Sequence, residues 1–406
     1  MKVKEFEVLI LGSDANAYYM ARCAYEAYHK KAHLIGKGKL AFTKFSDILT
    51  IEYQDNLWDE QAFIDIVNNY AKKFSCQVLV ISTNETYSMF LARNREMLEK
   101  NLVFFKQDVQ ILETLTNKEK FYKTYKNSSL CFPDTHYFDV TKNTVIPSMN
   151  YPIVLKPANV VEYNHITFED KHKIYKLNTE EEVKDTIEQI KKAGYKDRLI
   201  LQEFIPGDDS YLFDSVVYVD KKGKVKVISF AQIGLQERSK SMVGNAATLI
   251  NGYNTFEGDT KAMKENIISF MEKLGMNGFF EFDMKYDERD KTFKVLEINA
   301  RQGRCSYYIT PLGANLVSIM VQDLIEQKEL AFQDLKDEYL LSFVPKGIVR
   351  KYIKNEPFKE KALSLWKKKR VSPMECKEDK NFLRFLMMKK RLWHYKKEYQ
   401  NSYWEE

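Results

Sequence analysis

The stretch VLEINARQGR, at residues 295–304, places a carboxylate, an amide and a guanidinium at two-residue intervals. Successive side chains of a β-strand point to opposite faces, so we expect Glu297, Asn299 and Arg301 to share one face. Val295 is expected at the start of this polar face, and the apolar face would hold Leu296, Ile298 and Ala300. A strand with one solvated face shows the same alternation, so chemistry at this site requires a partner strand.

The preceding stretch, GFFEFDMKY at 278–286, supplies that partner. The charged loop DERDK joins the two stretches, which predicts an antiparallel hairpin. Centring the hairpin near residue 290 places Asp283 opposite Glu297 and Tyr286 opposite Lys294. Directly opposed residues have Cβ atoms about 4.5–5.5 Å apart, and two like charges there are destabilising. The pairing therefore predicts a cation between the strands.

The polar side chains of this hairpin match the preferences of Mg²⁺. Asp283, Glu297 and Asn299 offer hard oxygen ligands, and a bridging Glu297 could serve two ions. Arg301, one step further along, would then point at an anion held by the metal. An acidic hairpin that simply faces solvent is the alternative.

Two lysines upstream could meet the phosphates of a nucleotide. Lys156 follows the apolar stretch YPIVL at the mouth of an expected strand, and Lys118 precedes an expected helix. A lysine ammonium is a common partner of phosphate. An ion pair with a carboxylate is the alternative for either residue.

A strand followed by a turn, LQEFIPGDD at 201–209, could hold the nucleoside. Backbone groups of Glu203 and Ile205 could pair with an adenine edge, and Asp209 could reach ribose hydroxyls. An ordinary turn at the entry of a hairpin has the same sequence features.

Residues 6–115 alternate apolar strands, polar turns and helical periodicity, which predicts a βαβ domain with a parallel sheet. Ligands of such sheets bind beyond the carboxyl ends of the strands. Ser13 and Asp14 follow the first strand, and Asn84 and Glu85 follow a later one, so a substrate could lie there. Gly12 belongs to no GxGxxG motif, which weakens any dinucleotide hypothesis.

Composition narrows the class of protein. Of the 406 residues, 44% are hydrophobic and 30% are charged, which excludes a disordered chain and one embedded in a membrane. No apolar run reaches the roughly 20 residues that span a bilayer. The five cysteines form no CxxC pair, which is typical of a reducing compartment. We therefore expect a cytoplasmic protein.

Charge is concentrated at the carboxyl end. Residues 346–406 contain 18 Lys and Arg against 8 Asp and Glu, a net charge of +10, whereas the whole chain carries +6. Such a segment could contact an anionic membrane or a phosphate-bearing ligand. Alternatively it is a solvated helical surface in which Trp366, Phe385, Trp393 and Trp404 are packing residues.

Five motifs in this order resemble the ATP-grasp superfamily of carboxylate–amine ligases over residues 115–311. They are NKEKF, PIVLKPA, LQEFIPGDD, FEFDMK and LEINARQGR. The resemblance implies an ATP-grasp fold of mixed α/β and α+β class, preceded by a Rossmann-like domain. It divides the chain into an N-terminal α/β domain at 1–114, a small lid subdomain at 115–204, a large subdomain with the metal site at 205–330, and a basic helical extension at 331–406.

The same resemblance implies cofactors and roles. ATP and Mg²⁺ are the expected cofactors. The expected ATP-binding residues are Lys118, Lys156, Gln202, Glu203, Ile205 and Asp209. The expected magnesium ligands are Asp283, Glu297 and Asn299, and Arg301 is expected to steady the acyl phosphate and the tetrahedral intermediate. Ser13, Asp14 and Arg304 are candidates for substrate binding, with Arg304 contacting a second carboxylate of the donor or serving as a structural arginine.

Within the superfamily, GSDANAYYMAR, KPANVVEY, FEDKHK and NARQGRCSYYIT are similar to the D-aspartate ligase branch. That branch attaches the β-carboxylate of D-aspartate to a lysine amine of a peptidoglycan precursor. The expected lid loop, NVVEYNHITFEDKHK, contains no glycine, whereas many ATP-grasp lids are glycine-rich. Side chains of Asn159, Lys171, His172 and Lys173 could replace backbone groups at the phosphates.

The expected function is thus ADP-forming ligation of an amino-acid carboxylate to an amine through an acyl phosphate. One alternative is an ATP-grasp ligase that decorates a surface polysaccharide or makes a small peptide. Another is a non-catalytic nucleotide-binding regulator, against which the retention of Asp283, Glu297, Asn299 and Arg301 argues. No nucleic-acid-binding motif accompanies the basic segment, so nucleic acid is not an expected partner.

Overall fold

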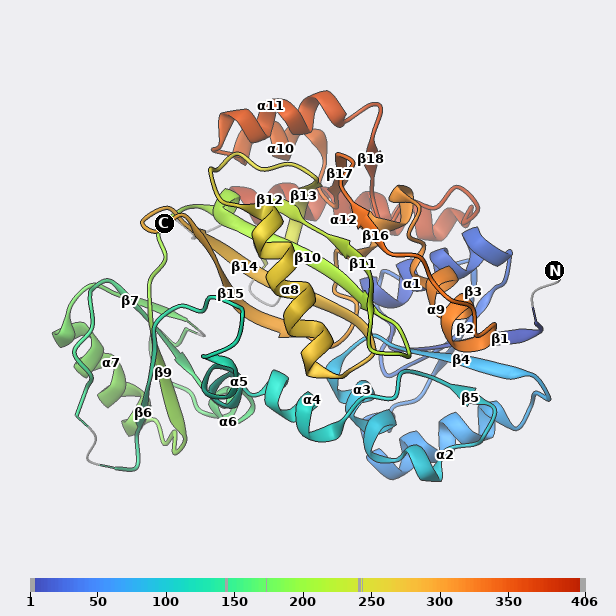
Figure 1. The fold of residues 1–406 in the computed structure, drawn as a ribbon, viewed down its shortest axis with the longest axis horizontal. Helices are drawn as coiled ribbons and strands as arrows, with labels where there is room; N and C mark the ends of the chain where they lie inside the picture. Colours follow the sequence, from blue (N-terminus) through green and yellow to red (C-terminus); the bar gives the residue numbers. More distant parts are fainter. Residues whose placement is uncertain (1–3, 143–144, 173, 240–241, 243, 402–406) are drawn as a thin grey trace.

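Three β-sheets organise the chain in the computed structural model, which describes residues 4–142, 145–172, 174–239, 242 and 244–401 (Figure 1). A five-stranded sheet belongs to the N-terminal part, a four-stranded sheet to the middle, and a nine-stranded sheet to the centre of the molecule. The arrangement is the mixed α/β and α+β class that the sequence predicted.

The N-terminal sheet is entirely parallel, in the order β3-β2-β1-β4-β5. Its strands are β1 (Phe6–Leu11), β2 (Ala32–Gly36), β3 (Leu49–Tyr53), β4 (Gln77–Ser82) and β5 (Leu102–Val103), and its helices are α1 (Ala15–Tyr28), α2 (Glu60–Ala71) and α3 (Glu85–Arg93). The order is that of a Rossmann-like fold. Gly12 follows β1 with a φ of 125°, and a Cβ there would overlap Thr83, so the turn requires glycine.

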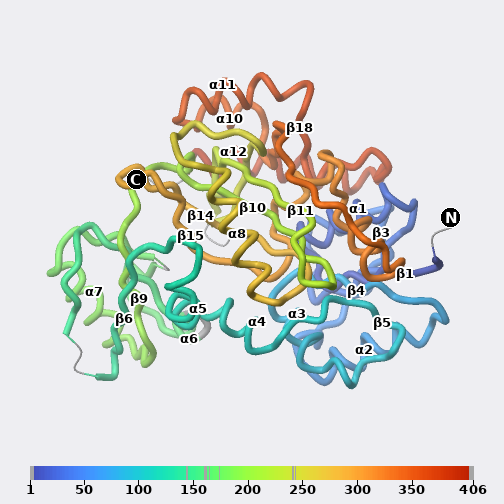
Figure 2. Tube along the Cα trace, in the orientation of Figure 1, coloured from blue at the N-terminus to red at the C-terminus, as the bar shows by residue number. Residues whose placement is uncertain are grey.

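Two short helices, α4 (Val109–Thr116) and α5 (Lys118–Tyr125), lead from this sheet to the next (Figure 2). The four-stranded sheet is antiparallel, in the order β6-β9-β7-β8. Its elements are β6 (Thr135–Asp139), β7 (Ile153–Pro157), α6 (Val160–His165), β8 (Tyr175–Leu177), α7 (Glu180–Lys192) and β9 (Arg198–Glu203). Lys156 lies near the end of β7, as the sequence suggested.

The central sheet runs β15-β14-β10-β12-β13-β17-β18, with β11 beside β10 and β16 beside β11. These strands are β10 (Leu212–Val219), β11 (Val225–Ser229), β12 (Ala231–Gln236), β13 (Ala246–Asn251), β14 (Gly278–Asp287), β15 (Thr292–Asn299), β16 (Gln333–Leu335), β17 (Tyr339–Ser342) and β18 (Arg370–Val371). A turn joins β10 to β11, with Gly223 at a φ of 76°.

Helices surround this sheet: α8 (Thr260–Leu274), α9 (Leu316–Met320), α10 (Lys346–Tyr352), α11 (Glu356–Leu365) and α12 (Phe382–Gln400). The expectation of a helical extension over 331–406 differs from the structure in one respect. The described part of this segment also supplies β16, β17 and β18 to the central sheet. These short strands pair with distant ones, so local sequence patterns did not reveal them.

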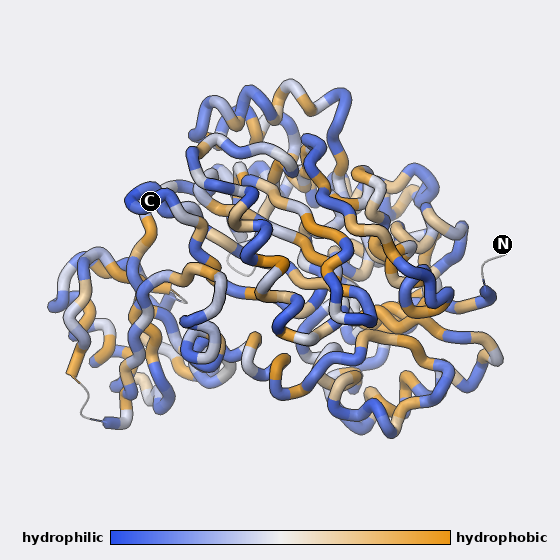
Figure 3. Tube along the Cα trace, viewed as in Figure 1, coloured by the Kyte–Doolittle hydropathy of each residue, from blue (hydrophilic) through white to orange (hydrophobic). Residues whose placement is uncertain are grey.

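Hydrophobic residues concentrate on the strands at the centre, while outer loops are largely hydrophilic (Figure 3). One core cluster joins α1 to the central sheet and to α10 and α12. Trp366 packs against it, whereas Phe385 and Trp393 are about half exposed, at 52% and 51%. The packing role expected for these aromatic residues thus holds for Trp366 alone of these three, and Trp404 lies outside the described residues.

No single helix in the described part of the chain is long and apolar enough to cross a membrane. One pair of segments, Ser306–Leu312 and Leu316–Ile325, has the combined length and apolar composition of a membrane span, but the two are bent by 83° relative to each other.

Candidate active site

The hairpin of β14 and β15 pairs Asp283 directly with Glu297, as predicted. A bulge between Asp283 and Met284 shifts the register beyond that point, so Tyr286 faces Phe293 and not Lys294. The prediction for Tyr286 was wrong because a hairpin without a bulge was assumed.

The same bulge changes the face of Val295. This side chain is fully buried and belongs to the apolar cluster that contains Ile298 and Ala300. The expectation that Val295 shares the polar face was therefore wrong. Glu297 and Asn299 lie beyond the bulge and keep the alternation that places them together.

The expected magnesium ligands are in mutual contact. Asn299 Nδ2 donates a hydrogen bond to Asp283 Oδ2 at 3.1 Å. Glu297 Oε2 lies 2.5 Å from Lys118 Nζ, which comes from the start of α5. The charge of Lys118 lowers the pKa of Glu297 to about 2. Burial and the charges of Glu281 and Glu297 raise the pKa of Asp283 well above its usual value.

Two further carboxylates lie at this site that sequence analysis missed. Asp214 of β10 pairs with Asp283 across the sheet, and Glu281 precedes Asp283 by two residues. Oxygen atoms of Asp214, Glu281 and Asp283 lie within 4.8 Å of one another. Burial raises the pKa of Asp214 to about 7 and raises that of Glu281 well above its usual value. The alternation in FEFD could have indicated Glu281, whereas Asp214 is revealed by strand pairing alone.

The donor set fits Mg²⁺. It consists of carboxylate and amide oxygens, which are the hard ligands that this ion takes. The raised pKa values of Asp214, Glu281 and Asp283 report buried negative charge that repels itself. A divalent cation beside Asp283, Glu297 and Asn299 would offset that repulsion.

Lys156 and Lys118 lie close to each other near these acids. Lys156 Nζ donates to Gln202 Oε1 at 2.9 Å. Burial, together with the charge of Lys118, lowers the pKa of Lys156 to about 7. Although burial opposes its charge, Lys118 has a raised pKa because of Glu297. Phosphate would meet two cations here, one of which carries no directly paired carboxylate among the described residues.

Residues that follow strands of the N-terminal sheet lie near Arg301. Arg301 Nη2 lies 2.7 Å from Oε1 of Glu85, the first residue of α3. Asp14 caps α1 by accepting from the Ala17 amide at 3.1 Å, and Arg301 is close enough to lower its pKa, which burial nevertheless raises. Ser13 is buried beside it. The structure thus brings Ser13, Asp14 and Arg301 to one junction.

Sequence comparison identifies the chain. The ATP-grasp domain family matches residues 115–303. A D-aspartate ligase from Enterococcus faecium is 31% identical over 403 residues, which covers 95% of this chain and 94% of that protein. The chain belongs to the ATP-grasp ligases. A D-alanine–D-alanine ligase from a Wolbachia strain is 26% identical over 210 residues, covering 47% of this chain and 59% of that protein.

Solved structures share the fold of this ATP-grasp ligase. An L-amino acid ligase from Bacillus licheniformis has a TM-score of 0.58 at 18% identity, covering 80% of this chain and 75% of that one. An N5-carboxyaminoimidazole synthetase from Staphylococcus aureus, solved with ADP, has a TM-score of 0.60 at 14% identity, covering 84% and 82%. The protein is therefore an ADP-forming C–N ligase with ATP and Mg²⁺ as cofactors.

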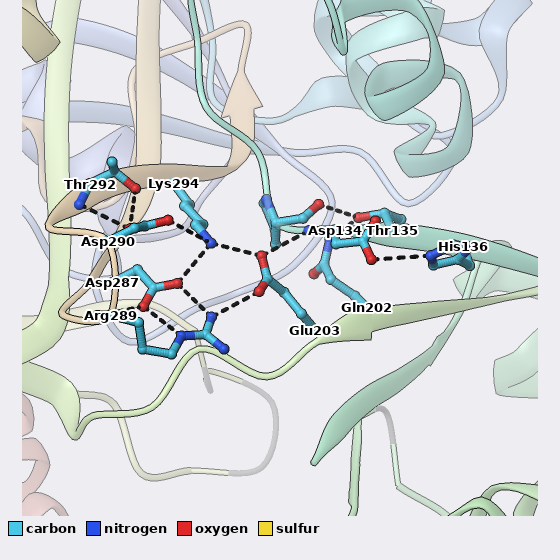
Figure 4. Close-up of polar contacts among 11 residues, drawn as sticks. Asp134, Thr135, His136, Gln202, Glu203, Asp287, Arg289, Asp290, Thr292 and Lys294 are labelled. Carbon is cyan, nitrogen blue, oxygen red and sulfur yellow. Dashed lines mark hydrogen bonds and ion pairs between the residues drawn. The ribbon is translucent and has the colours of Figure 1, made fainter. Parts of the chain in front are cut away.

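Glu203 ties the four-stranded sheet of this ligase to the hairpin (Figure 4). Its carboxylate accepts from Lys294 Nζ at 2.9 Å, from Arg289 Nη2 at 2.8 Å and from the Asp134 amide at 2.9 Å. Asp287 joins the same cations, and they hold its pKa below the usual range although burial opposes this. The side chain of Glu203 is thus engaged, and its backbone N–H donates to Asp134 O at 2.9 Å. The expected adenine contact through the Glu203 backbone stays a prediction.

Other residues expected to bind ATP lie along this junction. Gln202 Nε2 donates to Thr135 Oγ1 at 2.7 Å, so Gln202 connects Lys156 to β6. Ile205 is buried just after β9. Asp209 accepts from Arg238 Nη2 at 2.7 Å and from the Gln236 amide at 2.8 Å. Its expected contact with ribose stays a prediction.

Arg304 is held by partners from other elements, although its charge also acts to lower the pKa of Asp14. It is buried, forms an ion pair with Glu237, donates to Tyr395 Oη at 3.2 Å, and lies 4.2 Å from the ring centre of Phe343. These partners match the structural arginine that the sequence left open. Contact with a donor carboxylate would require this guanidinium to leave Glu237.

The glycine-free lid loop is held by its own side chains. Asn159 caps α6 by accepting from the Glu162 amide at 3.1 Å, and Lys171 Nζ donates to Ile166 O at 2.5 Å. The backbone of His172 bonds to Tyr163 and Tyr175. Lys173 lies outside the described residues. A direct phosphate contact from this loop stays a prediction.

Proposed function

We propose that this ATP-grasp ligase joins the β-carboxylate of D-aspartate, or of a related amino acid, to an amine of a peptidoglycan precursor. The observation that carries the proposal is the 31% identity to a D-aspartate ligase along nearly the full length of both chains. The grouping of Lys118 and Lys156 with Asp283, Glu297 and Arg301 supports it, since an amino-acid ligase needs phosphate, metal and donor groups at one point.

In the proposed first step, an oxygen of the donor carboxylate attacks the γ-phosphorus of ATP, and ADP leaves. The product is an acyl phosphate. Lys118 and Lys156 would offset charge on the transferring phosphoryl group, a task of electrostatics and positioning. ATP phosphates would favour the charged form of Lys156, whose pKa of about 7 in the free protein leaves it only partly protonated.

Asp283, Glu297 and Asn299 would hold magnesium, which supplies neutralisation of phosphate charge when bound. The ion pair of Glu297 with Lys118 supports this assignment, because it keeps the Glu297 carboxylate ionised. Gln202, Glu203, Ile205 and Asp209 would hold adenine and ribose.

In the second step, the amine nitrogen attacks the acyl carbon, a C–N bond forms, the nitrogen releases one proton, and phosphate leaves with the mixed-anhydride oxygen. Arg301 would stabilise the oxyanion of the tetrahedral intermediate. Its ion pair with Glu85 supports this role, since it fixes the guanidinium at the junction with the N-terminal sheet. Ser13 and Asp14 would contact the donor, and Arg304 is a weaker candidate because Glu237 already engages it.

A cytoplasmic setting accompanies this proposal. It is supported by the five cysteines, none of which forms a disulfide.

Hydroxylamine trapping tests the proposal. The protein, ATP and Mg²⁺ are incubated with a panel of carboxylates led by D-aspartate and L-aspartate, and hydroxamate and ADP are measured. Signal confined to D-aspartate supports the donor assignment. Hydroxamate formed with another acid would identify that acid as the donor and would favour polysaccharide decoration or peptide synthesis as the function. Binding of ATP without hydroxamate from any acid contradicts the proposal and favours a regulator.

A further inference from the structure

The inner face of α12 is fixed to the fold. Arg384, Tyr395 and Tyr399 are buried along it. Tyr395 Oη donates to Glu237 Oε1 at 2.9 Å, and Tyr399 Oη donates to Gln236 O at 2.5 Å. Residues four, seven or eleven apart lie on one side of a helix, so this spacing defines one buried side. The opposite side of the helix therefore faces away from the fold.

That outward side carries large apolar residues. Phe382, Leu386 and Trp393 follow one another at intervals of four and seven residues, and they are 67%, 47% and 51% exposed. We call these three residues the outer stripe. Contiguous exposed apolar groups on a folded protein mark an interaction surface.

Four exposed lysines border the outer stripe: Lys389, Lys390, Lys396 and Lys397. At 100° per residue, Lys389 and Lys396 lie on one side of the stripe, and Lys390 and Lys397 lie on the other. Lys397 Nζ is 4.0 Å from the ring centre of Trp393. Glu398 is the one acidic residue of α12, and its carboxylate lies 3.9 Å from Arg391 on the inner half. Beyond these lysines lie Phe385 on one side and Leu383 on the other, 52% and 51% exposed. The outward side therefore carries lysines between large apolar residues.

We propose that the outward side of α12 docks on an anionic lipid bilayer. A helix lying in the bilayer interface buries an apolar stripe at the boundary of headgroups and acyl chains, and its lysines meet lipid phosphates. Tryptophan and phenylalanine are favoured at that boundary. A nucleic acid would satisfy the lysines and leave the stripe in water, and an apolar protein groove would do the reverse. This inference does not depend on which donor the ligase uses.

Sedimentation with vesicles tests the docking. The full-length protein is mixed with vesicles of phosphatidylglycerol and phosphatidylcholine, or with vesicles of phosphatidylcholine alone. We expect binding to the anionic vesicles that weakens as salt is added. Trp393→Ala should weaken it about tenfold. Lys389→Gln with Lys390→Gln should weaken it about fivefold for each charge removed.

Matched controls come from exposed residues elsewhere. Trp58 is 54% exposed on the N-terminal part, so Trp58→Ala removes the same side chain from another surface. Lys191→Gln with Lys192→Gln removes two adjacent exposed lysines from α7. Both controls should bind anionic vesicles as the parent protein does. Phe382→Ser provides a second stripe variant if Trp393→Ala fails to fold by circular dichroism.

Three results would overturn the proposal. They are equal sedimentation with both vesicle types, unchanged binding in the stripe and lysine variants, and equal losses in the Trp58 and α7 controls. Size-exclusion chromatography adds a fourth: a dimer abolished by Trp393→Ala, without vesicle binding, would identify the surface as a contact between copies of this chain. The hydroxamate assay is run separately without lipid, so failure of the ligase proposal is distinguishable from failure of this one.

Discussion

The two ends of the β14–β15 hairpin contain similar residues in opposite electrostatic conditions. Near the turn, Asp287 is surrounded by Lys294 and Arg289, and these cations hold its pKa below the usual range. At the other end, Asp283 lies among further carboxylates, and its pKa is raised well above the usual range. We call these regions the clamp end and the acid end.

The contrast distinguishes a structural ion-pair network from the proposed metal site. At the clamp end, cations and carboxylates already satisfy one another, and Glu203 fastens the four-stranded sheet there. At the acid end, buried acids outnumber the nearby cations, which is unfavourable without a bound cation. Perturbed pKa values cluster at functional sites for this reason.

The sharpest test of the acid end is Glu297→Gln. We expect ATP-dependent turnover to fall by about 10³-fold or more, because the change removes a ligand charge beside the phosphates. The fold should persist, since glutamine keeps the shape of the side chain. Hydroxamate formation and circular dichroism measure the two effects. Glu257→Gln, an exposed residue paired with Lys291, is the matched control and should retain activity. Normal turnover by the Glu297 variant would mean that Glu297 is not a magnesium ligand.

The next largest effect is expected at Lys156. Its pKa of about 7 means that the charged form declines as pH rises through 7. Bound phosphate favours that charged form, so we expect KM for ATP to increase from pH 6 toward pH 9. Lys156→Met should raise KM about 100-fold and remove this dependence. Steady-state kinetics across this pH range provide the measurement. An identical pH profile in both proteins would mean that another group titrates.

At the clamp end, Asp287→Asn should affect stability more than chemistry. The change leaves Lys294 without a fully buried partner and should lower the free energy of unfolding by about 1–2 kcal/mol. The depressed pKa of Asp287 gives stabilisation that is present above its unfolded pKa and lost as pH falls below that value. The variant should therefore lose less stability than the parent between neutral pH and pH 3. Urea unfolding at both pH values checks this, and parallel losses would contradict it.

The smallest expected effect belongs to Asp214. Asp214→Asn removes one buried acid while its Oδ1 can still accept from Tyr308 Oη. Relief of repulsion should stabilise the magnesium-free protein by about 1 kcal/mol at pH 8, where the parent carboxyl is ionised. The further increase in Tm on adding Mg²⁺ should be smaller than in the parent. Thermal unfolding with and without Mg²⁺ measures both effects. An increase in Tm on adding Mg²⁺ equal to that of the parent would mean that Asp214 does not interact with the metal.

Much of the fold was predictable because its signals are local. Alternation along 297–300 and repeated strand–turn–helix patterns near the N-terminus each depend on residues close in sequence. Order and spacing of the motifs around Lys118, Lys156 and Glu297 were enough to predict the ATP-grasp family, which comparison confirmed.

Local sequence patterns could not predict contacts between segments that are distant in the chain. The bulge that turns Val295 inward depends on pairing with β14, and the position of Asp214 depends on pairing of β10 with β14. The partners of Arg304, which are Glu237 from the end of β12 and Tyr395 from α12, come from segments far apart in the chain.

The sequence by itself determined the family, the cofactors and the shared face of Glu297 and Asn299, because periodicity and motif order are written along the chain. Only the tertiary structure decided which acids crowd together and which are paired with cations. It also decided which side of α12 faces outward. Burial and Coulomb interactions depend on distances through space, and folding alone sets those distances.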